Sequence, residues 1–261
     1  MKLKFTTKMY IAVNAVLLIF RTIQILFLTE AQTAFLKPNL LAINIIATII
    51  ITILLLYTAA NSYLAIRQPT AIGNTGNVGF VLGIISAVLF LAGFISTLIY
   101  QPHIWSILAV SSLATSATST LYAVSQKSTQ PLPRVAPLSF IVLGVFAIVS
   151  AYMFYSEHPL RVRTVYEFFA LVSAVLFFLS FGKAVSAVKP KQNFRLMYPL
   201  GIVSSTLCFA SVVPELLASV FNATDKISST CVSQFILFAC GLFIATVTLS
   251  THMRTNTKKI D

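Results

Sequence analysis

Apolar residues occur in long runs along this chain, and polar residues are concentrated in the short segments between them. A membrane-spanning helix needs roughly 20 mostly apolar residues, and eight runs come close to or exceed that length. The predicted spans are Met9–Leu28, Leu40–Ile66, Gly79–Tyr100, Ile104–Val124, Leu138–Tyr155, Val165–Gly182, Tyr198–Val220 and Cys231–Ser250. The pattern therefore predicts an all-α integral membrane bundle of about eight helices.

The eight runs cover roughly 170 residues, so short connections and the termini account for the rest of the 261-residue chain. We therefore expect one polytopic transmembrane domain over residues 1–261, without an extramembrane domain. The composition agrees, since 57% of residues are hydrophobic, 9% are charged and the mean hydropathy is +0.91. These values exclude a soluble enzyme. An outer-membrane barrel is excluded because its strands alternate polar and apolar residues.

Proline supports the boundaries of the predicted spans, because it lacks an amide donor and disfavours helix in the residue before it. Nine of the ten prolines fall in connections or first turns, Pro199 among them, and only Pro214 lies inside a span. The first run follows Lys2 and Lys4, as in a secretory signal. Arg21 interrupts that run and no good cleavage site follows it, so we interpret it as a retained span.

Basic residues are distributed very unevenly between the two sides of the membrane that eight spans would define. Four lie on the side opposite the termini: Lys37, Arg161, Arg163 and Lys226. Thirteen lie on the side of the termini: Lys2, Lys4, Lys8, Arg67, Lys127, Arg134, Lys183, Lys189, Lys191, Arg195, Arg254, Lys258 and Lys259. The positive-inside rule then predicts cytoplasmic termini, and we expect a multi-pass protein of the cell membrane.

The net charge of +12 is thus mainly an orientation signal and an attraction to the anionic lipids of the cytoplasmic leaflet. The expected partners are the lipid bilayer and these anionic lipids. Nucleic acid is not expected as a partner, because the basic residues are scattered among short loops and do not form one footprint.

Three ionisable residues fall inside predicted spans: Arg21, Glu167 and Glu215. Counting residues from the outer ends of their spans gives depths of roughly 10, 3 and 8 Å, respectively. An ionisable residue within a membrane indicates a functional site by default, because burying a charge in lipid is costly.

Each of these charges also has a structural interpretation. Glu167 would pair with Arg163 or reach the headgroups, and Arg21 would form a salt bridge with Glu215 or Glu167. Glu215 follows Pro214, where the loss of a backbone hydrogen bond would open the helix to water.

Neutral polar residues occur at comparable depth, namely Gln24, Asn44, Tyr166 and Gln234, and Asn14 and Gln24 share a rough helical face with Arg21. If these faces converge, they form an outward-facing polar pocket. The predicted substrate- or ion-binding residues are Arg21, Glu167, Glu215, Gln24 and Gln234. Such a pocket would bind a small polar or zwitterionic solute, or carry a proton on a carboxylate.

The fourth predicted span is rich in hydroxyl groups: Ser106, Ser111, Ser112, Thr115, Ser116, Thr118, Ser119 and Thr120. Small hydroxyl residues permit close helix packing and can bond to the preceding turn of their own helix. The alternative is that they form a hydrated wall of a pathway towards the cytoplasm.

Catalytic signatures are absent from the sequence, which has no His-Glu-x-x-His, no Gly-x-Ser-x-Gly and no phosphate loop. The three histidines lie in predicted loops or at a helix end, and the three cysteines have no metal-binding spacing. We therefore expect no enzymatic activity, no cofactor and no metal site.

Two functions are left open. The first is a small-solute or ion transporter, or a permease-like module, that uses the outward-facing polar site. The alternative is a non-transporting sensor, assembly factor or subunit of a larger membrane complex, in which the charges are structural or contact a membrane protein partner.

Overall fold

A computed structural model describes residues 2–29, 37–65, 76–100, 106–128, 132–157, 162–188, 190–221 and 233–257. These residues are almost entirely helical. The α-helices are α1 (Lys2–Ile23), α2 (Leu41–Ala65), α3 (Asn77–Tyr100), α4 (Ser106–Ser125), α5 (Leu138–Glu157), α6 (Val162–Val185), α7 (Pro190–Val220) and α8 (Gln234–Thr257). A π-helix, η1 (Gln24–Leu28), continues α1, and a 3₁₀ turn, η2 (Pro38–Leu40), leads into α2. The predicted all-α membrane bundle is confirmed.

Six of these helices are long and apolar enough to cross a membrane within the described residues: α1 with η1, α2, α3, α4, α6 and α7. The apolar parts of α5 and α8 are shorter, over Leu138–Met153 and Gln234–Ser250. The chain is therefore an integral, multi-pass membrane protein. The predicted starts of the fourth and eighth spans, Ile104 and Cys231, lie outside the described residues.

The predicted start of the seventh span is wrong. The seventh helix was expected to begin at Tyr198, with Pro199 in its first turn, but α7 begins at Pro190 and contains both Pro199 and Pro214. Proline suits the first position of a helix, where its missing amide has no partner to lose. Each interior proline removes one backbone hydrogen bond, and packing against neighbouring helices offsets that loss in a membrane bundle.

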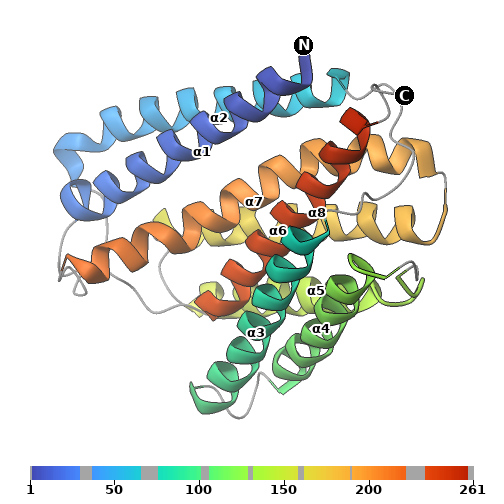
Figure 1. The fold of residues 1–261 in the computed structure, drawn as a ribbon. Coiled ribbons are helices and arrows are strands. Elements are labelled where there is room, and N and C mark those ends of the chain that lie inside the picture. The colour runs from blue at the N-terminus through green and yellow to red at the C-terminus, as the bar shows by residue number, and fades with distance from the viewer. Residues whose placement is uncertain are drawn as a thin grey trace.

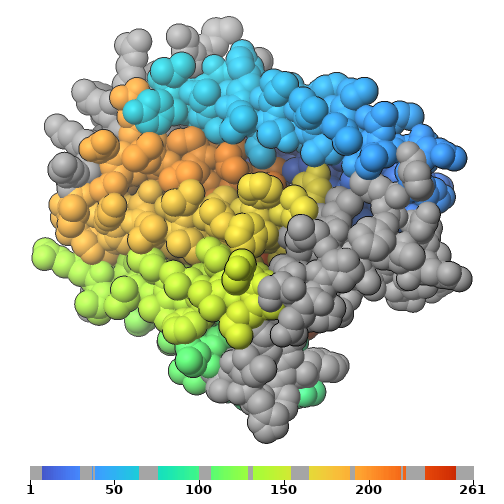
Figure 2. All heavy atoms as spheres, turned by 180° about the vertical axis from the view of Figure 1, so that it is seen from behind, coloured from blue at the N-terminus to red at the C-terminus, as the bar shows by residue number. Residues whose placement is uncertain are grey.

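Helix α7 occupies the centre of the bundle. The antiparallel pair α1 and α2 lies along one side of it, α6 and α8 pack on other sides, and α3 and α4 lie farther out (Figure 1). Seen from behind, α2, α7, α6 and α5 form successive bands, with α2 at one edge of the molecule (Figure 2). The beginning of α1 and the end of α8 lie at the same end of the bundle (Figure 1).

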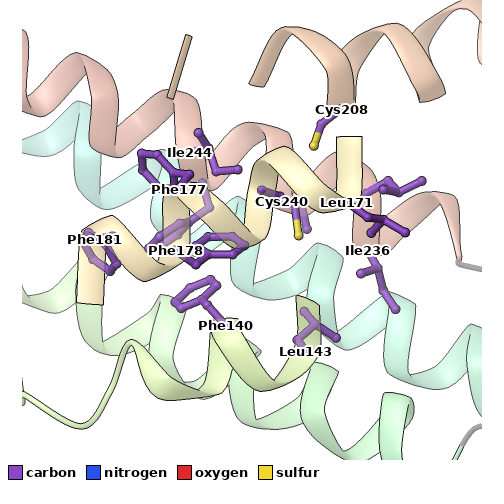
Figure 3. Close-up of a cluster of buried hydrophobic side chains, with 14 of the residues drawn as sticks. Phe140, Leu143, Leu171, Phe177, Phe178, Phe181, Cys208, Ile236, Cys240 and Ile244 are labelled. Carbon is purple, nitrogen blue, oxygen red and sulfur yellow. The ribbon is translucent and has the colours of Figure 1, made fainter. Parts of the chain in front are cut away.

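An aromatic core fills the space between α3, α4, α5, α6 and α8 (Figure 3). Phe140 of α5 stacks on Phe178 of α6 with ring centroids 4.8 Å apart, and its ring lies 4.2 Å from that of Phe243 of α8. Tyr122 of α4 packs edge-on against Phe243, at 5.0 Å. Side chains from α7 extend this core, whereas none of its buried members comes from α1 or α2.

The hydroxyl-rich helix α4 is joined to α3 by a series of hydrogen bonds. Ser112, Ser116 and Ser119 donate to the main-chain oxygens of Phe90, Ala87 and Gly83 at 2.8, 2.7 and 3.1 Å. The hydroxyl groups of Ser111 and Thr120 bond within the helix itself, and those of Thr115 and Thr118 also bond to Ser139 of α5. The packing interpretation of this helix therefore accounts for the hydroxyl groups between Ser111 and Thr120, whereas the side chain of Ser106 lies outside the described part of the chain.

Candidate functional site

A chain of polar contacts around Arg21 joins α6, α1, η1 and α2. Arg21 is only 2% exposed, and its Nη1 atom donates a hydrogen bond to Oε1 of Gln24. The side-chain amide of Gln24 in turn donates to Oδ1 of Asn44 on α2. On its other side, the guanidinium lies over the ring of Tyr166 on α6, with Cζ 4.2 Å from the ring centroid. The structure thus brings Arg21, Gln24, Asn44 and Tyr166 into one network.

The π-helix η1 positions Gln24 within this network. Its five residues follow directly on α1, and Gln24 and Ile25 are its buried residues. The hydroxyl of Thr29 closes this segment by donating to the main-chain oxygens of Gln24 and Ile25, at 2.6 and 3.1 Å. Single π-turns are rare and frequently occur at functional sites. Thr29 and the π-turn were not predicted from the sequence, because no residue pattern distinguishes this turn from the α-helix before it.

Glu215 of α7 and Gln234 of α8 form a second polar contact at the same end of the bundle. The amide Nε2 of Gln234 donates to Oε2 of Glu215 at 2.8 Å, and Glu215 is 2% exposed. Pro214, immediately before it, is also buried. The predicted opening to water at this proline is therefore absent, and the carboxylate is held by an amide of the neighbouring helix.

The helix register places Arg21 and Glu215 at the same level. Helices α1 and α7 run in the same direction (Figure 1), and the hydroxyl groups of Tyr10 and Ser205 meet at 2.7 Å. Tyr10 and Ser205 are 195 residues apart in the sequence. Because the two helices are parallel, the same offset places Arg21 beside residue 216, in the turn that contains Glu215. Leu17 of α1 and Ala210 of α7 belong to one apolar cluster, which agrees with this register.

Glu167 lies deeper in the bundle than predicted. Helix α6 begins at Val162, three residues before the predicted start, and Glu167 is only 1% exposed. Ser204 of α7 donates to the main-chain oxygen of Ser173 on α6. Since these helices are antiparallel, Glu167, six residues before Ser173, lies level with Ala210, six residues after Ser204. It is therefore roughly 7 Å nearer the bundle centre than Glu215, at 1.5 Å per helical residue. The Glu167 side chain is therefore enclosed by protein; the side chain of Arg163, its other predicted partner, lies outside the described residues.

Long helical side chains lean towards the N-terminus of their helix. For Arg21 this direction leads inwards, from the level of Glu215 towards the level of Glu167. The position of the Arg21 guanidinium over the ring of Tyr166, the residue before Glu167, agrees with this direction. Seven polar residues lie near this end of the bundle, and we call them the polar layer. Arg21, Gln24 and Asn44 lie on the α1–α2 side. Tyr166, Glu167, Glu215 and Gln234 form the α6–α8 side. Asn14 does not join it, since its amide donates to the main-chain oxygen of Tyr10 on its own helix.

No group of three or more potential metal-ligating side chains occurs in the described part of the chain. Comparisons with protein-family models, with curated proteins and with solved structures found no match.

Proposed function

We propose that this protein is a small-solute or ion transporter, or a permease-like module, whose binding site is the polar layer between α1–α2 and α6–α8. The observation that carries the proposal is Arg21, a guanidinium buried within a membrane bundle and surrounded by polar groups from several separate segments. Replacing buried charges with well-packed apolar residues is often neutral or stabilising, so a charged layer in a membrane protein suggests function.

The chemistry of the layer suits a small polar or zwitterionic ligand. A guanidinium binds carboxylate or phosphate oxygens through a planar fork of donors, whereas two carboxylates would attract an amine, a metal cation or a proton. The π-turn at Gln24–Leu28, which continues α1, is of a kind that frequently occurs at functional sites.

The proposed orientation places the polar layer in the outer half of the cell membrane. Lys127, Arg134, Lys183 and Arg195 all flank helix ends opposite the polar layer. Three contacts join these ends: Lys127 over the ring of Phe80, Ser186 to the main-chain oxygen of Arg134, and Arg195 over the ring of Tyr63. The positive-inside rule makes this the cytoplasmic end, where anionic lipids would be the partners.

Ligand-dependent thermal stabilisation tests the proposal. The purified protein in lipid nanodiscs would be heated with a panel of amino acids, amines, organic acids, sugars and inorganic ions. A ligand at 100 times its Kd adds about 2.7 kcal/mol of stability, which corresponds to a shift in Tm of roughly 5 °C or more. We expect Arg21→Ala and Glu215→Gln to abolish the shift.

Asn14→Ala is the matched control, because Asn14 lies on the same helix as Arg21 and its amide donates to the main-chain oxygen of Tyr10 on that helix. This variant should keep the full ligand-induced shift. A shift that survives in both Arg21→Ala and Glu215→Gln would place the ligand elsewhere. No shift with any solute of the panel would favour the alternative, a non-transporting sensor, assembly factor or subunit that contacts a partner protein.

A further inference from the structure

The packing divides the described residues into two bodies. Helices α3–α8 share the large aromatic and aliphatic core, to which α1 and α2 contribute no buried residue. Helices α1 and α2 form a hairpin, whose turn is closed by a hydrogen bond from the Lys37 amide to the main-chain oxygen of Leu28 at 2.9 Å. We call α3–α8 the scaffold and α1–α2, with η1 and η2, the hairpin.

The hairpin meets the scaffold mainly along α7, through two small apolar clusters and several polar contacts. Near the basic end, Tyr10 bonds to Ser205, and Arg195 donates from Nε to the main-chain oxygen of Tyr63 at 3.3 Å. At the opposite end, the Arg21 guanidinium lies over the ring of Tyr166. Small apolar clusters and individual polar contacts are easier to separate than a large interlocked core.

The charged centre of the polar layer is buried, whereas Tyr166 and Gln234 are half-buried. Arg21, Gln24 and Glu215 are each at most 2% exposed, so a solute can reach them only after part of the bundle moves. Moving any scaffold helix would break the aromatic core, whereas moving the hairpin leaves that core intact.

We infer that the α1–α2 hairpin is the gate of the polar layer and moves as a unit against α7. The contact of Arg21 with Tyr166 holds the outer end of the gate closed, and the contacts Tyr10–Ser205 and Arg195–Tyr63 hold the inner end. This inference rests on the proposed function for the purpose of the motion, but the motion itself can be measured without a ligand.

Distances between spin labels, measured by pulsed electron paramagnetic resonance, test the gate. The three native cysteines would first be replaced by alanine. One label pair, Lys37→Cys with Phe221→Cys, joins the hairpin to the scaffold at exposed positions. The control pair, Tyr152→Cys with Phe221→Cys, lies entirely within the scaffold. We expect a second, longer-distance population for the hairpin pair and a single narrow distribution for the control pair.

Tyr166→Leu removes the ring beneath the guanidinium and should increase the longer-distance population of the hairpin pair. Tyr166→Phe keeps the ring and should leave that population at its original level. A single narrow distribution for the hairpin pair in every variant would overturn the gate, as would an equal displacement of the control pair. An equal increase in both Tyr166 variants would overturn the role of the ring contact. If the spin labels show that the hairpin moves but no solute of the panel raises the Tm, the gate is upheld and the transport proposal is contradicted.

Discussion

The contact between α5 and α6 provides a quantitative test of the packing. A Cβ atom added at Gly144 would lie 2.4 Å from Cγ2 of Val175, and its next-nearest neighbours would be Cβ and Cα of Val175, at 3.6 and 3.9 Å. Valine has one strongly preferred rotamer in a helix, so Cγ2 cannot rotate away without cost. Gly144→Ala must therefore push α5 and α6 apart.

The expected magnitude comes from two opposing terms. Overpacking of a well-filled interior costs about 1–3 kcal/mol, and a distance of 2.4 Å places this site towards the upper end. Alanine is favoured over glycine in a helix by about 1 kcal/mol. Gly144→Ala should therefore lower the free energy of unfolding by roughly 1–2 kcal/mol.

A second substitution isolates the contact. Val175→Ala removes Cγ2 and leaves only ordinary van der Waals distances to the new methyl group. The double variant Gly144→Ala/Val175→Ala should thus be more stable than the sum of the two single losses predicts, by about 1 kcal/mol. Gly182→Ala is the control at the same helix pair, because its nearest atoms, on Ile141 and Pro137, lie at 3.5 Å. It should be neutral or stabilising by up to about 1 kcal/mol.

Reversible unfolding in mixed micelles with increasing denaturing detergent would measure these free energies. Gly144→Ala as stable as the unaltered protein would refute the close approach of α5 and α6. Strict additivity in the double variant would refute the contact with Val175 as its cause.

Two further predictions follow from the helix contacts and the orientation. Ser116→Ala should lower the free energy of unfolding by about 0.6 kcal/mol and at most about 1.7 kcal/mol, because it removes an interhelical hydrogen bond to the main-chain oxygen of Ala87. Thr120→Ala removes a hydrogen bond within α4 only and should have a smaller effect in the same unfolding assay. In intact cells, Lys37→Cys in a cysteine-free background should react with a membrane-impermeant thiol reagent, whereas Lys183→Cys should react only after permeabilisation; reaction of both without permeabilisation would contradict the proposed topology.

The lengths of the apolar runs predicted the helices well, because the bilayer requires every backbone polar group to be bonded within a helix. The failure at Pro199 has a physical origin. Proline disfavours helix locally, but the packing that keeps α7 continuous through residues 190–220 comes from helices distant in sequence. A local rule therefore placed the start of α7 eight residues too late.

The partners of α4 were not predictable in the same way. The spacing of Ser112, Ser116 and Ser119 indicates one helix face, yet their acceptors are main-chain oxygens of α3. Every residue carries such an oxygen, so the sequence does not specify which helix receives the bonds. Composition could indicate close packing of α4 but could not identify α3 as its neighbour.

The same limit applies to the candidate site: the sequence predicts the depth of a polar residue in its helix but not which residues it contacts. Counting from the span ends predicted that Arg21 and Glu215 lie at similar depths, and the α1–α7 register agrees. The count placed Glu167 nearer the outer end than Glu215, whereas the α6–α7 register sets Glu167 level with Ala210, because the count does not show how far α7 extends beyond α6. The contacts of Arg21 with Tyr166 and of Gln24 with Asn44 require knowing that side chains of α1 and η1 reach α6 and α2, respectively, at this end. Polar residues at matching depths therefore predict a layer, and only the arrangement of the helices determines which of its members meet.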